Sequence, residues 1–497
     1  MRREAVVSDL LDALDERRVI GALPRSVSGV VADSRRVSPG DCFVAVPGFR
    51  QDARRFVPQA VRRGAGVVVT EGGPLPDVPV GQVLVPSARR ALSRLAAFWY
   101  EHPSRALTLV GITGTNGKTT TSYLVDALLR ARGTPTGIIG TIQYVIGDEV
   151  LPAGQTTPEA LDIQEMLATM RTRGVRGVAM EVSSHALALH RADDLDFDVA
   201  VFTNLTQDHL DFHGTLDAYR AAKRRLFELL AAGRKPRRTA VVNGDDPSGA
   251  AMVAGLDVPV LRFGLGEGAR VRPTEWRSSL DGIRLSVDTP AGRVTLVSPL
   301  VGEHNVMNLL AAVATGLALG LPAETIARAL GAVTAVPGRF ERVDVGQPFL
   351  VVVDYAHTPD ALERVLATAR RVTRGRLAVV FGCGGDRDRG KRPVMGEIAA
   401  RLADRVWVTS DNPRSEVPGA IIDEILAGVR RVSGADARVL AEPDRRTAIR
   451  AALDAAAGGD TVVIAGKGHE TYQLVGSEVL PFDDRDVARR ILQERGA

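Results

Sequence analysis

The sequence predicts an α/β protein with three domains, and three observations lead to that prediction. From about residue 105 onward, short runs rich in β-branched residues alternate with helical patterns, which is typical of parallel sheets. Polar, glycine-rich segments follow these runs, where ligands bind at the carboxyl ends of parallel strands. The chain has 497 residues, too many for a single core. We therefore expect domains over residues 1–104, 105–336 and 337–497.

Each predicted domain has its own strand pattern. The first, with GVVADSRRVSPGDCFVAVPG and GAGVVVT, predicts a small α/β domain of short strands. The second is expected to be a P-loop-type parallel sheet, and the third a Rossmann-like sheet. Their predicted strands cover residues 107–112, 177–182, 199–202 and 239–242, then 349–353, 377–381, 406–408 and 461–465. The apolar stretch 306–321 contains an asparagine and is too short to span a membrane, so it predicts a buried helix.

Charge and cysteine content exclude several classes of function. The 63 basic and 59 acidic residues nearly cancel, and no aromatic residues interleave with the basic cluster RKPRR at 234–238. We expect that cluster to be a solvated turn rather than a nucleic-acid site. Two cysteines cannot form a disulfide framework or a cysteine-rich metal site. The first residues lack an apolar signal core, so we expect a cytoplasmic, monomeric protein without membrane insertion.

The segment GITGTNGKTT at residues 111–120 predicts a phosphate-binding loop. It follows an apolar run, and its glycines let backbone N–H groups surround an anion while Lys118 adds a positive charge. Thr119 offers a hydroxyl to a phosphate-bound Mg²⁺. Gly111 lies six residues before Gly117, one more than in the common P-loop pattern, so this is a variant cradle.

Polar residues at other strand ends predict a magnesium site and a second substrate. Thr119, Glu181 and His209 are candidate ligands, although Glu181 could instead be an acid that stabilises a helix N-terminus. Six of the 8 histidines lie in or beside the strand-end loops. Arg, Asp and His in the third domain favour a charged substrate facing the nucleotide. Phosphoryl transfer to a carboxylate, followed by attack of an amine, would use such an arrangement.

An ordered set of motifs resembles the Mur ligases of peptidoglycan synthesis. The motifs are TGTNGKTT, EVSSH, TNLTQDHLDFHG, EHNVMN, PGRFE, VVVDYAHTPDAL, FGCGGDRDRGKRP, SDNPR and GKGHE. The resemblance runs from about residue 33 to the C-terminus. It implies that ATP phosphorylates the terminal carboxylate of a UDP-N-acetylmuramoyl dipeptide. The amine of an amino acid, here meso-diaminopimelate, then attacks the acyl phosphate.

The resemblance also implies residue roles in catalysis and nucleotide binding. Lys118, Glu181, His209 and Lys223 would be catalytic, and the metal set would be Thr119, Glu181, His209 and Lys223. Lys223 would carry a carbamate derived from CO₂; its simpler interpretation is a surface lysine on an amphipathic helix. The implied ATP contacts are Gly114, Thr115, Asn116, Gly117, Lys118, Thr119, Thr120, Asn305, Arg339 and Asp354.

Two further sets would bind the other substrates. The implied diaminopimelate contacts are Arg387, Asp411, Asn412, Pro413, Arg414, Gly466 and Glu470. Arg414 can pair with the distal carboxylate, which lysine lacks, although a structural salt bridge is the simpler alternative. The implied UDP-muramoyl-dipeptide contacts are Ser34, Thr156, Thr157, Ser183 and Arg191. The loop GFRQDA at 48–53 and Leu189 depart from the family pattern.

Three alternatives remain open at this point. The same ligase could add LL-diaminopimelate or L-lysine. A folylpolyglutamate synthetase-like ligase shares the ATP and lysine features, although SDNPR and DSRRVSPGD argue against it. The third alternative is a non-catalytic nucleotide-binding protein of wall synthesis. The complete catalytic set argues against it, because such a protein has no physical need for those residues.

Overall fold

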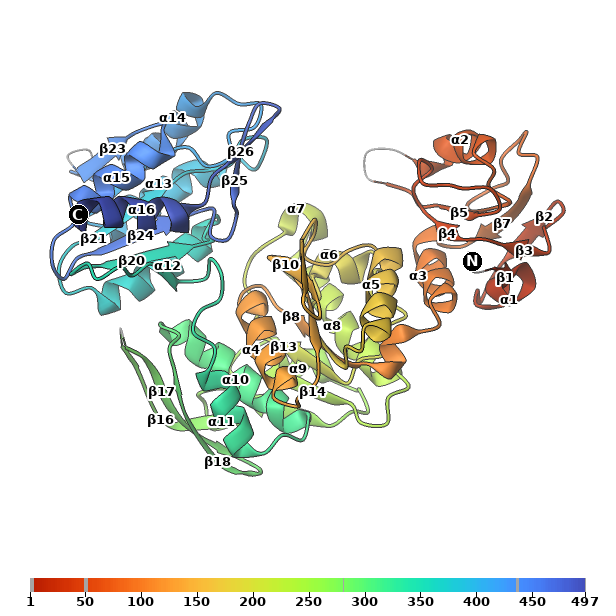
Figure 1. Cartoon of the computed structure of the whole chain (residues 1–497), viewed down its shortest axis with the longest axis horizontal. Helices are drawn as coiled ribbons and strands as arrows, with labels where there is room; N and C mark the ends of the chain where they lie inside the picture. The colour runs from red at the N-terminus through yellow and green to blue at the C-terminus, as the bar shows by residue number, and fades with distance from the viewer. Residues whose placement is uncertain (1–3, 49–51, 280, 435–437, 497) are drawn as a thin grey trace. The chain divides into compact units, whose positions relative to one another are not determined.

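The computed structural model describes residues 4–48, 52–279, 281–434 and 438–496 (Figure 1). The chain forms two compact units. One contains Met1–Glu275, Ser286–Leu296 and Met307–Leu330; the other contains Trp276–Leu285, Val297–Val306 and Gly331–Ala497. Parallel sheets form the centre of both, so the predicted α/β class is confirmed. The boundaries at residues 104 and 336 stay predictions.

The N-terminal part of the first unit has a five-stranded sheet of order β2-β7-β6-β5-β4, parallel except for β2. Valines of β5, β6 and β7 are buried against α1 and α3. The elements are β1 (Ala5–Val6), α1 (Val7–Asp12), β2 (Arg18–Ile20), β3 (Ser26–Val27), β4 (Val30–Val31), β5 (Cys42–Ala45), η1 (Ala53–Phe56), α2 (Val57–Arg62), β6 (Val67–Glu71), β7 (Gly81–Val85), α3 (Ala88–Trp99) and η2 (Pro103–Ala106).

The central sheet has eight strands in the order β11-β10-β9-β12-β8-β13-β14-β15, and the six from β9 to β15 are parallel. Its strands are β8 (Thr108–Thr113), β9 (Thr136–Ile139), β10 (Gln143–Ile146), β11 (Glu149–Pro152), β12 (Gly177–Glu181), β13 (Val199–Phe202), β14 (Thr239–Asn243) and β15 (Val260–Phe263). Its helices are α4 (Lys118–Arg130), α5 (Ala160–Thr172), α6 (Ser184–Ala188), α7 (Leu210–His213), α8 (Leu216–Ala232) and α9 (Gly249–Val253).

A three-stranded sheet and two helices follow. They are β16 (Arg272–Ser279), β17 (Gly282–Thr289), β18 (Gly292–Ser298), α10 (Glu303–Ala318) and α11 (Ala323–Gly331). The apolar stretch predicted as a buried helix lies mostly in α10, whose leucines and alanines from 309 to 314 are fully buried. Within the described residues, no helix is long and apolar enough to cross a membrane.

The C-terminal sheet has the order β19-β20-β24-β21-β22-β23 and is parallel except for β19. Its elements are β19 (Glu341–Arg342), β20 (Leu350–Asp354), α12 (Pro359–Val372), β21 (Leu377–Phe381), α13 (Lys391–Leu402), β22 (Arg405–Val408), α14 (Pro418–Val429), β23 (Val439–Ala441), α15 (Arg445–Asp454), β24 (Thr461–Ala465) and α16 (Asp484–Gly496). A hairpin of β25 (Tyr472–Val475) and β26 (Glu478–Pro481) lies between β24 and α16.

Helices cover both faces of this C-terminal sheet, as the alternation of side chains along each strand requires. Val352, Val379 and Val463 pack with apolar residues of α12, α13 and α14. Their neighbours Val351, Val380 and Ile464 pack instead with α15 and α16. Both faces of the sheet are therefore buried under apolar side chains, so a polar ligand can bind only at the strand ends.

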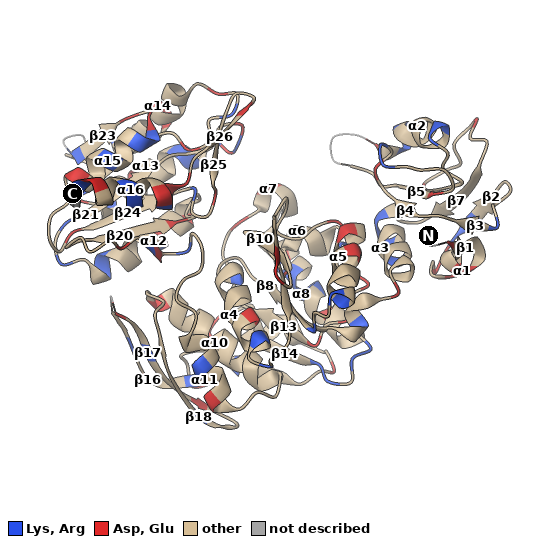
Figure 2. Ribbon diagram, in the orientation of Figure 1, with Lys and Arg blue, Asp and Glu red and all other residues tan. Residues whose placement is uncertain are grey.

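Charged side chains of both signs are interspersed over the helices and loops (Figure 2). The predicted solvated turn at 234–238 is partly structural. Arg238 donates to the carbonyl oxygens of Leu230 and Gly233 at the end of α8. Lys235, with a side chain only 9% exposed, pairs with Asp198 at 3.0 Å. Two cationic residues of the cluster thus form structural contacts: Arg238 with the end of α8, and Lys235 with Asp198 next to the central sheet.

One ion pair in the C-terminal domain is completely buried. Arg445 on α15 makes a two-pronged pair with Asp484 at the start of α16, at 2.8 and 2.7 Å, and both side chains are 0% exposed. The guanidinium also donates to the carbonyl oxygens of Ser410 and Ala465. These two residues immediately precede Asp411 and Gly466, so the pair fixes the ends of β22 and β24.

We expect Asp484→Ala to destabilise the C-terminal domain by about 3–5 kcal/mol, because it leaves a buried guanidinium without its counter-charge. Hydrogen exchange of α15 and α16 in the full chain, measured by mass spectrometry, would report the loss of protection. The matched control is Glu494→Ala, which breaks an exposed pair with Arg450 between the same two helices and should change little. Equal protection in both variants would contradict the structural role of the buried pair.

Candidate functional site

The predicted phosphate loop connects β8 to α4 at the carboxyl edge of the central sheet. β8 lies between β12 and β13, and α4 starts at Lys118. Gly114 has φ +150°, and a Cβ there would overlap the hydroxyl of Thr203, which follows β13. Lys118 curls back over the loop, and its Nζ donates to the carbonyl oxygens of Gly114 and Thr115 at 2.9 and 2.8 Å. The loop is thus tightly turned, with the Lys118 ammonium lying over its backbone.

Glu181 is the last residue of β12, paired in register with Ile112 of β8. Its carboxylate is 1% exposed and accepts three hydrogen bonds. Thr119 Oγ1 and Thr141 Oγ1 each donate to Oε2 at 3.0 Å, and the backbone N–H of Thr141 donates to Oε1 at 2.9 Å. The contacts of Glu181 do not support the alternative of a helix-stabilising acid, because its carboxylate accepts hydrogen bonds from Thr119 and from Thr141 after β9.

Lys223 is buried in α8 with 1% exposure, so the surface-lysine interpretation is wrong. Its Nζ donates to the carbonyl oxygen of Gly114 at 2.8 Å, the same oxygen that Lys118 uses. Burial lowers the pKa of Lys223 well below its ordinary value, and the charge of Lys118 lowers it further. Both effects act against the protonated form of this side chain next to the phosphate loop.

Aromatic rings connect His209 to Lys223. The Tyr219 ring lies 4.4 Å from Lys223 Nζ, and its hydroxyl is 3.1 Å from Thr115 Oγ1. The His209 ring centroid lies 6.1 Å from that of Tyr219 and 4.8 Å from that of His185. Burial lowers the pKa of His209, and burial together with the neighbouring histidines lowers the pKa of His185 to about 4. Both rings are thus favoured in their neutral form, the form in which histidine binds metals.

The predicted substrate residues of the central domain lie along one hydrogen-bonded chain. Thr156 Oγ1 is 3.0 Å from Thr141 Oγ1, which itself contacts Glu181. Thr157 Oγ1 donates to the Glu181 carbonyl oxygen at 2.9 Å and accepts from the N–H of Ser183. Arg191 donates to the Thr157 carbonyl oxygen at 2.9 Å. The predicted substrate and metal residues are thus physically coupled.

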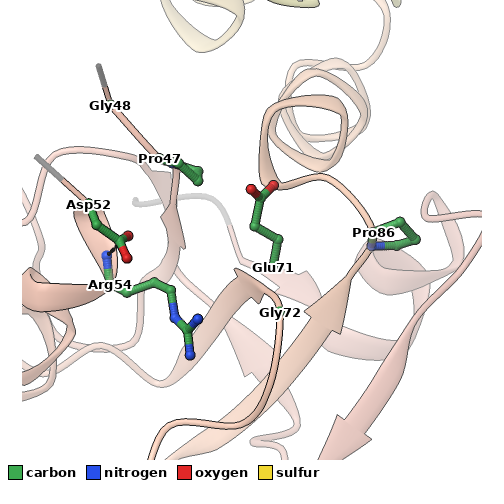
Figure 3. Close-up of a pocket in the computed structure, with 7 residues that line it drawn as sticks. All are labelled: Pro47, Gly48, Asp52, Arg54, Glu71, Gly72 and Pro86. Carbon is green, nitrogen blue, oxygen red and sulfur yellow. Dashed lines mark hydrogen bonds between the residues drawn. The ribbon is translucent and has the colours of Figure 1, made fainter. Parts of the chain in front are cut away.

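The N-terminal domain contains a pocket of about 430 Å³, lined by Pro47, Gly48, Asp52, Arg54, Glu71, Gly72 and Pro86. Figure 3 shows the Glu71 carboxylate between Pro47 and Pro86, with Asp52 and Arg54 next to each other on the same side of Glu71 as Pro47. Glu71 accepts from the N–H of Ala88 at the start of α3. Of the predicted residues, Ser34 is buried in this domain and donates to Gln59. In the divergent loop at 48–53, Phe49, Arg50 and Gln51 lie outside the described residues.

The segment Asp411–Asn412–Pro413–Arg414 follows β22 and is bonded to the β25–β26 hairpin. The Arg414 N–H donates to the Leu474 carbonyl oxygen at 3.0 Å, and the Gly476 N–H donates to the Arg414 carbonyl oxygen at 2.7 Å. Arg414 has φ +52°, a conformation that a non-glycine residue adopts only when its surroundings hold it. Its guanidinium donates to the Gly385 carbonyl oxygen at 2.8 Å and makes no ion pair with any described residue.

The remaining amino-acid residues lie at the ends of neighbouring strands. Gly466 follows β24, and a Cβ there would lie 2.5 Å from Asp411 Oδ2. Glu470 accepts from Asn412 Nδ2 at 2.8 Å. Arg387 is exposed in the loop after β21 and donates to the carbonyl oxygen of Asp386. The structure thus brings Asp411, Asn412, Gly466 and Glu470 into contact, while Arg387 lies on the surface of the same domain.

Asn305, Arg339 and Asp354 belong to the second unit. Asn305 is buried and donates to the Val301 carbonyl oxygen at 2.8 Å. Asp354 accepts from the N–H groups of Phe340 and Ala356, and burial raises its pKa although Arg339 opposes that shift. The Arg339 guanidinium lies 4.8 Å from the Tyr355 ring centroid. Arg339 and Asp354 therefore share one edge of the C-terminal sheet.

Three family models match the chain over most of its length. They are described as the Mur ligase family catalytic domain at residues 26–100, the Mur ligase middle domain at 112–316 and the Mur ligase glutamate ligase domain at 338–468. A protein of Solibacter usitatus is 49% identical over 95% of this chain and 94% of its own length. The chain belongs to the Mur ligase family.

Three curated relatives that are 46–49% identical to this chain carry the same name. The proteins of Solibacter usitatus, Geobacter metallireducens (46% identical, 98% of each chain) and Geobacillus kaustophilus (48% identical, 93% and 94%) are named UDP-N-acetylmuramoyl-L-alanyl-D-glutamate–2,6-diaminopimelate ligase. A solved structure of an enzyme with that name is 34% identical, covers 95% of this chain and 96% of its own, and has a TM-score of 0.68. The chain is therefore an enzyme of the ligase class.

More distant solved structures share the fold. The MurF ligase of Thermotoga maritima, solved with ADP, is 22% identical over 94% of this chain and 98% of its own, with a TM-score of 0.62. A folylpolyglutamate synthase of Mycobacterium tuberculosis is 21% identical over 75% of this chain and 91% of its own, with a TM-score of 0.61. Enzymes with different names thus share this fold, over 94% of the chain for the MurF ligase and over 75% for the folylpolyglutamate synthase.

Several residues that contact this Mur ligase site were not among those predicted from the sequence. Thr141 holds both carboxylate oxygens of Glu181, and Tyr219 separates His209 from Lys223. Asn308 of α10 is buried against the phosphate loop, where its Oδ1 would block a side chain at Gly117. Only Asn308 had a visible signal, as a polar residue within an otherwise apolar helix.

Proposed function

We propose that this Mur ligase joins 2,6-diaminopimelate to UDP-N-acetylmuramoyl-L-alanyl-D-glutamate at the expense of ATP, in peptidoglycan precursor synthesis. The observation that carries the proposal is the identity of 46–49% with relatives of that name over nearly the full chain. The geometry around Arg414 supports it, because a guanidinium without a protein counter-ion in the described part of the chain suits a ligand carboxylate.

The proposed chemistry has two steps. The γ-phosphoryl group of ATP passes to the substrate carboxylate, forming an acyl phosphate and ADP. The amine of the amino acid then attacks the acyl carbon, the C–N bond forms, and inorganic phosphate leaves. Negative charge accumulates on phosphoryl oxygens in both steps, and Lys118 with the N–H groups of residues 114–119 would stabilise it.

The residues around Glu181 fit a Mg²⁺ ion. Its carboxylate and the hydroxyl of Thr119 supply the hard oxygen donors that Mg²⁺ prefers, and His209 is favoured as a neutral ring. Within the described ranges, no group of three His, Cys, Asp or Glu side chains is arranged so that it could hold a metal ion, and the proposed set therefore includes Thr119 and a modified Lys223. When bound, Mg²⁺ would neutralise charge on the phosphoryl oxygens.

We further infer that Lys223 carries a carbamate. Its neutral amine attacks CO₂, a C–N bond forms, one proton is released, and an anionic carbamate results. Lys118 Nζ and Lys223 Nζ share the Gly114 carbonyl oxygen, so a protonated Lys223 would be repelled by Lys118. The modification would replace that repulsion by attraction between Lys118 and the new anion.

The other predicted contacts complete the proposal. The N-terminal pocket, of a volume typical for small-molecule sites, would take the nucleotide end of the UDP substrate together with Ser34. Thr156, Thr157, Ser183 and Arg191 would bind its peptide end, next to Glu181. ATP contacts by Asn305, Arg339 and Asp354, a cytoplasmic location and a monomeric state stay predictions.

The first test is phosphate release with ATP, Mg²⁺ and UDP-N-acetylmuramoyl-L-alanyl-D-glutamate. Meso-diaminopimelate, LL-diaminopimelate and L-lysine are supplied in turn. We expect release to depend on meso-diaminopimelate. Preference for the LL isomer or lysine would retain the ligase and change its amino acid. If no amino acid stimulates release, turnover of a folate substrate would favour the folylpolyglutamate synthetase-like alternative. No turnover of either substrate would favour the non-catalytic alternative.

We expect Lys223→Ala to lose most turnover and to regain part of it with added formate or acetate, which can occupy the place of the carbamate. Lys118→Ala is the matched control, because it should lose turnover without rescue. Wild-type protein equilibrated with carbon-13-labelled bicarbonate should also show a carbamate signal by NMR that Lys223→Ala lacks. Wild-type turnover in Lys223→Ala, or no carbamate signal, would contradict the inference.

We expect Arg414→Ala to raise the KM for diaminopimelate about 10- to 100-fold, the range for losing a hydrogen bond to a charged group. The KM for ATP should stay near the wild-type value. Arg389→Ala is the control, since Arg389 is an exposed arginine of the same domain that pairs with Glu424. Equal changes in both KM values would place Arg414 in the structure rather than in amino-acid recognition.

A further inference from the structure

Lys467 lies at the base of the proposed amino-acid site, yet no solvent reaches it. The residue is 0% exposed, in the segment that links β24 to the β25–β26 hairpin. The preceding Gly466 has φ +115°, a conformation open to glycine, and it turns the chain so that the lysine points inward. A lysine buried to this degree cannot touch a substrate, so its influence passes through the side chains around it.

Three polar side chains form a closed ring at this position. Lys467 Nζ donates to Asn412 Oδ1 at 3.1 Å and to Glu470 Oε2 at 3.2 Å. Asn412 Nδ2 donates to the same Glu470 oxygen at 2.8 Å. The ammonium therefore fixes the orientation of the Asn412 amide and, with it, one oxygen of the Glu470 carboxylate.

The hydrogen bonds of Glu470 are one-sided. Its Oε2 accepts both bonds of the ring, whereas no described residue donates to its Oε1. The Glu470 side chain is 17% exposed, so ligand can reach it although not Lys467. An ammonium group of the diamino acid would therefore find a carboxylate that is already oriented and has one oxygen remaining.

Resting on the proposed function, we propose that Lys467 is the positioning residue for the diamino acid: its buried side chain, bonded to Asn412 and Glu470, orients the Glu470 carboxylate to accept the substrate's ammonium. Glu470 binds the ligand, and Lys467 acts through it. The ring closes through Asn412, so the residue that adjoins Pro413 and Arg414 is positioned by the same charge.

The charges around Glu470 give this role a pH signature. Burial raises the pKa of Glu470, Asp411 raises it further, and Lys467 opposes both effects. The other ionisable groups that sense Glu470 are Tyr355, Tyr472 and Arg445, none of which changes charge near neutral pH. Removing the lysine charge therefore raises the pKa of Glu470, so the carboxyl is protonated, and unable to hold an ammonium, at a higher pH than before.

The test measures the KM for meso-diaminopimelate between about pH 5.5 and 8.5, a range that covers raised carboxyl pKa values. The wild-type enzyme is compared with Lys467→Met and Lys467→Gln. We expect both variants to raise this KM about tenfold at the acidic end, the effect of weakening one hydrogen bond to a charged group. The difference should shrink as the pH rises, and the KM for ATP should match wild type at each pH.

Two features of the design separate charge from packing. Lys467→Gln keeps a hydrogen-bond donor and fills the site if Lys467→Met does not fold; a wild-type pH profile in that variant would overturn the proposal. Lys235→Met, which removes a nearly buried lysine paired with Asp198 in the central domain, should leave the profile unchanged. A KM ratio to wild type that is constant with pH would also overturn it. Loss of diaminopimelate-dependent release in the wild type would instead contradict the proposed function.

Discussion

The carboxyl edge of a parallel sheet is the constraint on which both candidate sites depend. Parallel strands with helices on both faces leave no polar surface except at their ends. In the central sheet this edge brings the phosphate loop after β8, Glu181 at the end of β12 and Thr203 after β13 next to one another. In the C-terminal sheet, Asp354 at the end of β20 is paired in register with Ala465 at the end of β24. The segments that follow these two strands therefore start side by side at the same edge.

Each of these edges contains one buried lysine, and the two are placed in opposite electrostatic settings. Lys223 faces another cation and a carbonyl oxygen, and burial together with that cation lowers its pKa well below the ordinary value. Lys467 faces the carboxylate of Glu470, which supplies a counter-charge within 3.2 Å. Desolvation of a cation costs several kcal/mol in either place. The partner, rather than the depth of burial, therefore decides which chemistry is open to each amine.

Much of the fold and part of the site could be predicted from the sequence, because their signals are local. The expected strands coincide with β8, β12, β13, β14, β20, β21, β22 and β24, and the predicted phosphate loop connects β8 to α4. The site residues that were missed depend on long-range contacts. Thr141 meets Glu181 across 40 residues, and Lys467 meets Asn412 across 55. Thr141 lies in none of the quoted motifs, and the motif GKGHE that contains Lys467 does not reveal its contact with Asn412. Only the assembled structure brings these residues together.

The hydrogen bonds between the hairpin and Arg414 have a consequence for how such enzymes diverge. The motif Asp411–Asn412–Pro413–Arg414 owes its conformation to backbone bonds with Leu474 and Gly476, and Asn412 Oδ1 also accepts from the Leu474 N–H. A change of one residue in the length of β25 would reverse which side chains of that strand face the motif. The four-residue motif and the hairpin are thus a matched pair of segments, and a transplanted motif would keep its sequence without its conformation.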